Sequence, residues 1–149
     1  MFGSRDHLYI ALQGGLMMLP SRVDVAENAA VLLRKLTTAH GPLMFHQSGG
    51  CCDGSSPMCY LAGEFRVGGS DVLLGELIVD NIADPIKVWI SLPQFEYWKH
   101  THITIDAIPG RGGGFSLESP EGMRFLIHSR LYSDEEWALL ENATIITGA

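Results

Sequence analysis

The chain has 149 residues, of which 46% are hydrophobic, and this composition suits one globular domain with a buried core. Its 17 acidic and 10 basic side chains give a net charge of -7, so the surface should repel nucleic acid. No apolar run reaches the roughly 20 residues that a membrane-spanning helix needs, because Gln13, Gly14 and Gly15 interrupt the best one. We therefore expect neither nucleic acid nor a membrane as a partner.

Residues 1–20 are predicted to lie outside the domain. They lack the small-x-small cleavage pattern of a signal peptide, and Met17 or Met18 would serve equally well as a start. We interpret them as an N-terminal arm or an upstream-start extension. The single globular domain is then placed at residues 21–141, followed by a C-terminal tail at 142–149.

An amphipathic helix is predicted over residues 25–39. Its apolar side chains recur at steps of three and four residues. Asp24 and Glu27 have the spacing of a capping box at its start, and Gly41 with Pro42 ends it. This is the one long helix that the sequence predicts.

Seven short β-type segments follow Pro42, divided by turn residues. They are residues 43–47, 60–67, 72–79, 86–91, 102–108, 114–118 and 123–132. Residues 92–100 suit a single helical turn, and Ser133 with Glu136 caps a short closing helix. We therefore predict a mainly β, α+β fold, with the N-terminal helix packed on a mainly antiparallel sheet or barrel. Exposed apolar strands also predict a homo-oligomer.

All three cysteines lie in one glycine-rich loop, HQSGGCCDGSSPMC, at residues 46–59. An odd number of cysteines so close together cannot link distant parts of the fold, which favours a reducing cytoplasm. Glycine turns on both sides of the adjacent pair would aim backbone N–H groups at a thiolate. These turns contain Gly49, Gly50 and Gly54, and the adjacent pair is Cys51 and Cys52.

Three uses of this loop stay open. Cys52 and Cys59 are close enough in sequence for a disulfide, which would leave Cys51 as a free or exchanging thiol. The three thiols and His46 would instead make a four-ligand site for zinc or iron. The third use is structural, because free cysteine is often a small buried hydrophobe.

A second candidate metal site follows from the stretch HTHITID. Strand alternation puts His100, His102 and Asp106 on one face, where two imidazoles and a carboxylate would bind a divalent ion. Their spacing, continued to Gly113, resembles the first metal motif of the cupin family. The alternative is a pair of solvent-facing histidines on a half-exposed strand.

The glycine-rich stretch after Pro109 carries one positive charge. It contains Arg111, Gly112 and Gly113. A nucleotide-binding fingerprint opens a helix, whereas this stretch leads into a predicted strand, so we expect it to shape a tight hairpin or bulge. No grouping of serine, histidine and acid is evident that would make a hydrolase triad.

Several long segments resemble one bacterial family, catalogued as domain of unknown function 779, over residues 22–137. They are GPLMFHQSGGCCDGSSPMCY, GEFRVGGSDVLLGEL, QFEYWKHT and TIDAIPGRGGGFSLESPEGMRFL. The resemblance implies a small bacterial protein whose gene accompanies that of an NAD-dependent aldehyde dehydrogenase. It therefore implies an accessory or regulatory protein rather than an enzyme, with the dehydrogenase as its partner.

A weaker resemblance is to the HesB-like A-type iron–sulfur carriers, which run from a helix such as VAENAAVLLRKL into a strand and a GGC loop. It implies a compact, mainly β barrel behind one helix. Those carriers also use a late Cys-x-Cys pair, and EGMRFLIHSR has no cysteine at that position, so the resemblance implies the fold rather than a cluster. We expect an accessory protein that acts through Cys51, Cys52 and Cys59, with a thiol oxidoreductase or a metal-binding protein as the alternative.

Overall fold

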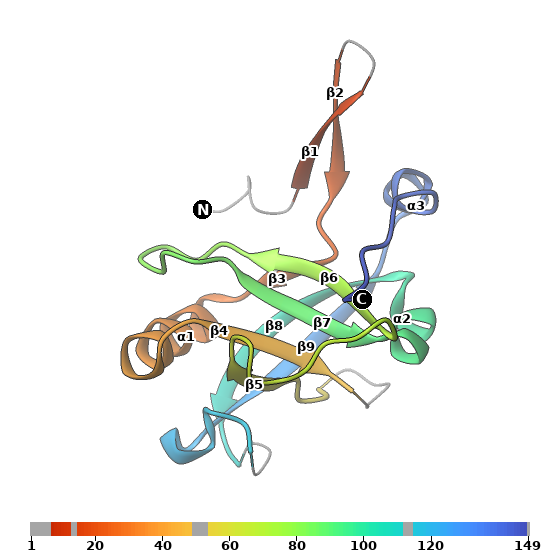
Figure 1. Ribbon diagram of the computed structural model, residues 1–149. Helices are drawn as coiled ribbons and strands as arrows, with labels where there is room; N and C mark the ends of the chain where they lie inside the picture. The colour runs from red at the N-terminus through yellow and green to blue at the C-terminus, as the bar shows by residue number, and fades with distance from the viewer. Residues whose placement is uncertain (1–6, 13–14, 49–53, 112–114, 149) are drawn as a thin grey trace.

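The computed structural model describes residues 7–12, 15–48, 54–111 and 115–148, with side chains from Leu19 onward (Figure 1). The helices are α1 (Glu27–His40), α2 (Leu92–Trp98) and α3 (Asp134–Leu140). The strands are β1 (His7–Leu12), β2 (Gly15–Pro20), β3 (Val23–Val25), β4 (Leu43–Gln47), β5 (Met58–Leu61), β6 (Asp71–Leu77), β7 (Ile86–Ser91), β8 (Thr101–Pro109) and β9 (Met123–Leu131).

The strands form two open sheets and a separate hairpin of β1 and β2. One sheet has the order β3-β8-β9 and the other the order β5-β4-β7-β6. Both sheets are mixed, because β3 runs parallel to β8 and β4 runs parallel to β7. The α+β class is confirmed, but the described strands do not close into a barrel, so that alternative is corrected.

The core lies where the two sheets and α1 face one another. Figure 1 shows β8 and β9 passing behind β4 and β7, with α1 at one side. The rings of Phe45 on β4 and Phe125 on β9 meet edge to face at 4.9 Å and join the two sheets. Gly75 on β6 lies so close to Val23 on β3 that a Cβ atom there would be 2.8 Å from Val23 Cγ1.

The long helix forms because one face is apolar, and its buried residues are Ala29, Ala30, Leu32, Leu33 and Leu36. It ends at Gly41, whose N–H still donates to the carbonyl of Thr37 and whose φ of 97° turns the following chain out of the helix. The predicted capping box at its start is wrong. The N-cap is Ala26, and Asp24 belongs to β3, where pairing with β8 holds its backbone extended.

Strand prediction succeeds for β4 and β7 and fails for residues 115–118, the described part of the predicted segment 114–118. Thr101–Pro109 and Met123–Leu131 pair directly with each other, so the chain between them is the connection of one long hairpin. In that connection the described residues form turns and a one-turn 3₁₀ helix at Ser119–Glu121. The predicted segment 60–67 is a strand only as far as Leu61.

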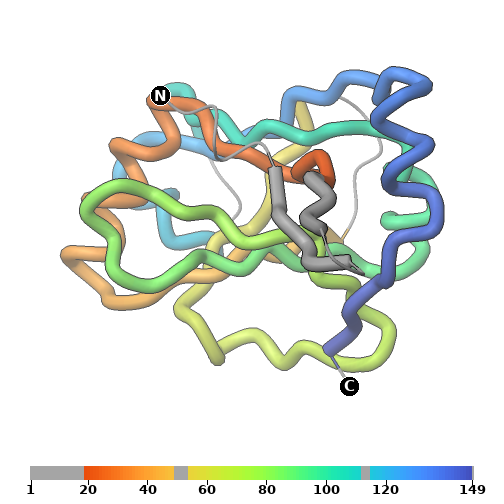
Figure 2. The backbone as a smooth tube through the Cα atoms, turned by 90° about the horizontal axis from the view of Figure 1, so that it is seen from above, coloured from red at the N-terminus to blue at the C-terminus, as the bar shows by residue number. Residues whose placement is uncertain are grey.

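The C-terminal tail returns to the edge of β6. The N–H of Leu73 donates to the carbonyl of Ile146 at 2.8 Å. The N–H of Gly148 donates to the carbonyl of Asp71 at 3.2 Å. Figure 2 shows this end of the chain beside the segment that leads into β6. The domain limits proposed from the sequence stay a prediction. No helix in the described part of the chain is long and apolar enough to cross a membrane.

Candidate functional site

His46, near the end of β4, has a hydrogen bond at each ring nitrogen. Its Nε2 is 2.7 Å from Oδ1 of Asp71, and its Nδ1 is 2.6 Å from Oγ of Ser48. The imidazole is only 3% exposed, and it stacks on the ring of Phe65 with centroids 4.2 Å apart. β7 separates β4 from β6, so the contact between His46 and Asp71 spans the strand between them.

The carboxylate of Asp71 fixes the proton of this imidazole. Burial alone would raise the pKa of Asp71, but hydrogen bonds from His46 and from the N–H of Gly68, with the charge of His46, together lower it. An ionised carboxylate only accepts hydrogen bonds, so Nε2 of His46 carries the proton. In the neutral ring Nδ1 then accepts from the hydroxyl of Ser48.

The structure therefore joins Ser48, His46 and Asp71 in one hydrogen-bonded row that the sequence did not reveal. Ser48 is exposed, whereas His46 is buried. A hydroxyl beside a base that a carboxylate orients is the arrangement that activates nucleophiles. Asp71 has no recognisable spacing to His46, because it follows 25 residues later in a turn-rich segment.

Cys59 lies on the other side of the same sheet. It pairs with Phe45 across β4 and β5, whereas His46 pairs with Met58. Residues directly opposite each other share a face and neighbours along a strand do not, so Cys59 faces the core with Phe45 and His46 faces away. The described residues therefore do not bring His46 and Cys59 together, and the predicted ligand set of His46 with all three cysteines stays a prediction, since Cys51 and Cys52 lie outside the described residues.

The Cys59 thiol is free and has no solvent exposure. Burial, and then the nearby carboxylate of Glu118, raise its pKa well above the ordinary value, so the thiolate is strongly disfavoured. Glu118 is itself completely buried, and it accepts hydrogen bonds from the Ser116 hydroxyl and the Phe125 N–H. Of the three uses predicted for the loop, a small buried hydrophobic side chain fits Cys59 best.

The other residues of the cysteine loop divide into two groups. Cys51, Cys52, Gly49, Gly50, Gly112 and Gly113 lie outside the described residues. Gly54 is described, and its φ of 91° suits the predicted turn. Its N–H donates to the carbonyl of Ile127, and its carbonyl accepts from Nη2 of Arg124. Arg111 is exposed.

The second candidate metal site separates into different contacts. His100 packs against Trp137 with ring centroids 4.3 Å apart, His102 bonds Oδ2 of Asp24 at 2.8 Å, and Asp106 bonds His128 at 3.0 Å. His102 is buried, so it is not the solvent-facing histidine of the alternative reading. Among the described residues no group of three or more histidines, cysteines and acids could hold a metal ion.

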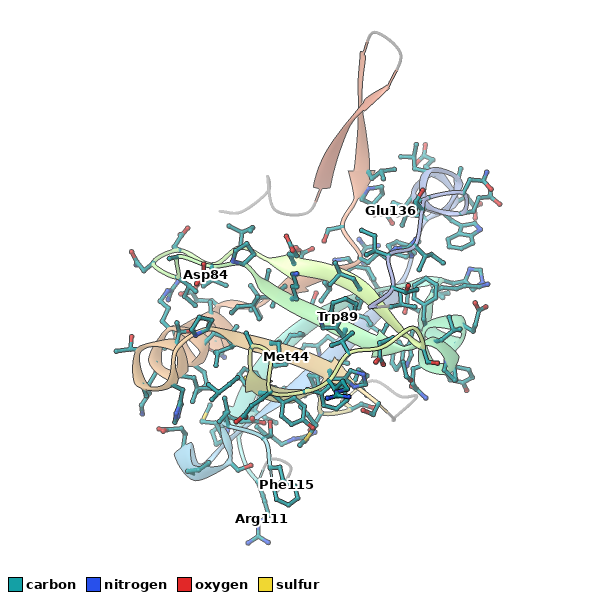
Figure 3. The ribbon with its side chains drawn as sticks, in the orientation of Figure 1. Met44, Asp84, Trp89, Arg111, Phe115 and Glu136 are labelled. Carbon is teal, nitrogen blue, oxygen red and sulfur yellow. The ribbon has the colours of Figure 1, made fainter. Side chains whose placement is uncertain are left out.

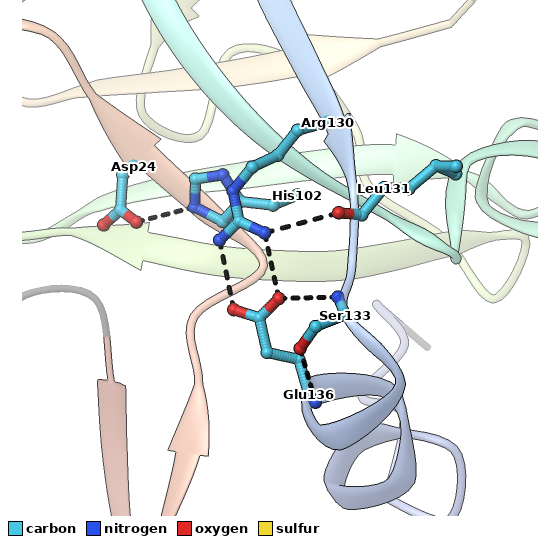
Figure 4. A network of polar contacts seen from close by, with 6 residues as sticks. All are labelled: Asp24, His102, Arg130, Leu131, Ser133 and Glu136. Carbon is cyan, nitrogen blue, oxygen red and sulfur yellow. Dashed lines mark hydrogen bonds and ion pairs between the residues drawn. The ribbon is translucent and has the colours of Figure 1, made fainter.

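The residues around His102 line a polar cavity of about 380 Å³ beside β3 and β8. Asp24, Arg130 and Glu136 contribute its charges, and Figure 4 shows Arg130 in a two-pronged contact with Glu136. The hydrogen bond from Arg130 and then that from the Ser133 N–H lower the pKa of Glu136 to about 2. Sequence analysis identified Glu136 only as a helix cap, and nothing in the pattern indicated that these three side chains, from β3, β9 and α3, line one cavity.

A larger cavity, of about 570 Å³, lies on the face of the four-stranded sheet to which His46 belongs. Met44 and Trp89 line it from β4 and β7, and Phe65, which also stacks on His46, lines it from the segment that covers the sheet. Figure 3 shows Met44 and Trp89 on these neighbouring strands. Ser48 and Asp71 line neither of these two cavities.

Comparison with known proteins gives one finding. The family described as Domain of unknown function (DUF779) matches residues 32–131, whereas no curated protein and no solved structure matches the chain. The matched range contains His46, Ser48 and Asp71 and the hairpin of β8 and β9, and it ends before α3. The likeness to iron–sulfur carriers stays a prediction. The chain belongs to the family Domain of unknown function (DUF779).

Proposed function

We propose that this protein is an accessory or regulatory partner of an NAD-dependent aldehyde dehydrogenase and that it acts through the thiols of Cys51 and Cys52. The resemblance described in the sequence analysis supports the choice of partner. The observation that supports the chemistry is the hydrogen-bonded row of Asp71, His46 and Ser48, which ends three residues before Cys51 in the sequence.

The proposed role of His46 is to accept a proton. A thiol reacts as its thiolate, and a neighbouring imidazole promotes the thiolate by taking the proton. Asp71 holds the His46 proton at Nε2 and so leaves Nδ1 as the basic atom, directed at Ser48 on the side where the loop begins. Aldehyde dehydrogenases use a cysteine nucleophile, so a partner thiol could protect or restore that cysteine by disulfide exchange.

The second candidate is a thiol oxidoreductase that acts without the dehydrogenase, and the same His46 contact favours it. Cycling in that case would involve Cys51 and Cys52 rather than Cys59, because the Cys59 thiol is buried. Metal binding, with zinc or iron, has weaker support, since both ring nitrogens of His46 are already engaged. We do not assign hydrolysis to Ser48, which lines neither of the two cavities described above.

The test is co-purification of the protein with an NAD-dependent aldehyde dehydrogenase. The variants are Cys51→Ser with Cys52→Ser, compared with Cys59→Ala. The double variant is expected to lose the dehydrogenase, whereas Cys59→Ala retains it because that thiol faces the core. Equal recovery with all variants would contradict the role of the loop.

Thiol titration of the purified protein separates the two candidates. Reversible formation of a Cys51–Cys52 or mixed disulfide, with no dehydrogenase recovered from any variant, would favour the independent oxidoreductase. Elemental analysis showing about one equivalent of zinc or iron would instead restore the metal-binding alternative.

A further inference from the structure

The 570 Å³ cavity on the outer face of the four-stranded sheet has a mainly apolar floor. Met44 and Trp89 are 4% and 9% exposed, yet they do not belong to the main hydrophobic core. They are buried instead under the chain segment that follows β5, from which Phe65 lines the cavity. Cavities of this size and composition are typical of sites for small molecules.

Two cations stand at this apolar surface without a partner. Arg66 and Lys87 line the cavity, and neither side chain has an ion pair or hydrogen bond with a described residue, although Lys87 lies opposite Glu76 across β6 and β7. Both are exposed, and Lys87 pairs across strands with Met44, next to the apolar floor. The cavity therefore carries two positive side chains in a chain whose net charge is -7.

One acidic side chain, Asp84, lies on the same lining. The three charged side chains of the lining therefore sum to +1, with Glu76 outside the lining, and this sum matches a ligand with one negative charge. A phosphate ester carries about -1.5 to -2 at neutral pH and would leave charge uncompensated. The planar guanidinium of Arg66 suits the two oxygens of a carboxylate, and Trp89 and Phe65 suit an aromatic or other flat apolar body.

We propose that this cavity binds a small monocarboxylate with an apolar, preferably aromatic, body. The carboxylate contacts Arg66 and Lys87, and the apolar body lies against Met44, Phe65 and Trp89. This inference goes beyond the proposed function, and its test involves neither the dehydrogenase nor a cysteine.

The test is calorimetric titration of the full chain with 4-phenylbutyrate and with 4-phenylbutan-1-ol, which has the same apolar body without the charge. We expect one site for the acid and clearly weaker binding of the alcohol. Arg66→Gln and Lys87→Gln should each raise Kd for the acid about fivefold, as expected for one partly exposed ion pair. Asp84→Asn should lower Kd, because it removes a like charge.

Arg111→Gln is the matched control, since Arg111 is exposed and Figure 3 shows it far from Met44 and Trp89. It should leave Kd unchanged. A shift of the Met44 methyl signal in NMR spectra should locate the acid in the cavity. No binding of the acid, equal affinity for acid and alcohol, or equal Kd in wild type, Arg66→Gln and Lys87→Gln would each overturn the proposal.

Discussion

At His46 the position of one proton depends on a residue far away in the sequence. The row of Ser48, His46 and Asp71 could not be predicted, because it requires that β7 be inserted between β4 and β6. The sequence shows these strands but not their order in the sheet. His46 and Cys59 lie on opposite faces of the sheet because of the register of β4 and β5. This register cannot be predicted from the sequence either.

Replacement of Asp71 by asparagine should destabilise the fold in a pH-dependent way. The pKa of Asp71 is lowered below its ordinary value of 3.8, so the unfolded chain binds a proton more readily than the folded chain does. The stabilising effect of Asp71 is therefore complete above about pH 4 and is lost as the pH falls through the lowered value. We expect Asp71→Asn to cost about 1–3 kcal/mol at neutral pH.

Urea denaturation near pH 7 and near pH 3 measures this effect. The difference in the free energy of unfolding between wild type and Asp71→Asn should be smaller at the lower pH. Asp84→Asn is a suitable control, since Asp84 is exposed and has no partner among the described residues. A difference of the same size at both pH values would show that the charge of Asp71 does not stabilise the row.

The individual elements were more predictable than their contacts. Short local stretches of sequence were enough to predict β4, β7 and the cap of α3. Alternating apolar residues indicate the two strands, and the capping residues indicate the start of the helix. Residues 114–118 look like a strand, but their polar side chains turn inward to hydrogen-bond in the hairpin connection. Ser116 bonds the N–H of Cys59, and Glu118 is enclosed beside it. A buried glutamate satisfied by distant partners has no local signature.

The start of α3 provides a test at the scale of one element. Ser133 accepts from the N–H of Glu136, and Glu136 accepts from the N–H of Ser133 and from Arg130. Because the pKa of Glu136 falls to about 2 from 4.5, its contribution is complete above about pH 4.5 and is lost toward pH 2. We expect Ser133→Ala to cost about 1 kcal/mol near neutral pH and Glu136→Gln to cost more.

Urea denaturation of both variants checks this prediction. The loss of unfolding free energy in Glu136→Gln, relative to wild type, should disappear as the pH approaches 2. The loss in Ser133→Ala should persist in part. Glu135→Gln, in the same turn, should resemble wild type, because Glu135 is exposed and has no partner in the described chain. If Glu135→Gln and Glu136→Gln are equally destabilised, the helix dipole rather than the cap is responsible.

In the whole molecule the candidate sites occupy the outer surfaces of the two sheets, while the core between them is mainly apolar. The three-stranded sheet presents Asp24 and His102, and the four-stranded sheet presents His46 and Trp89. The alternation of side chains along each strand predicts which residues share a face of the sheet. Only the structure shows which of the two faces is covered. The row of Ser48, His46 and Asp71 and the carboxylate cavity both belong to one side of the molecule, that of the four-stranded sheet.

The tail should stabilise this side of the molecule, because it completes the edge of the strand that carries Asp71. Removal of residues 142–149 deletes the two backbone hydrogen bonds that join the tail to β6, at Leu73 and at Asp71, and the close approach of Gly148 to Val67. At about 0.5–1.5 kcal/mol each, the lost bonds should lower the free energy of unfolding by about 1–3 kcal/mol. The Leu73 amide should also exchange its hydrogen faster.

Removal of residues 1–18 is the matching truncation. It should leave the free energy of unfolding and the exchange rate of the Leu73 amide nearly unchanged if the domain begins near residue 21. The shortened C-terminus also leaves the edge of β6 without its partner, and an unpaired edge favours association with another chain. Light scattering should therefore show a larger mass for the C-terminal truncation than for the full chain. Unchanged mass, together with unchanged protection of Leu73, would mean that the tail does not pair with β6 in solution.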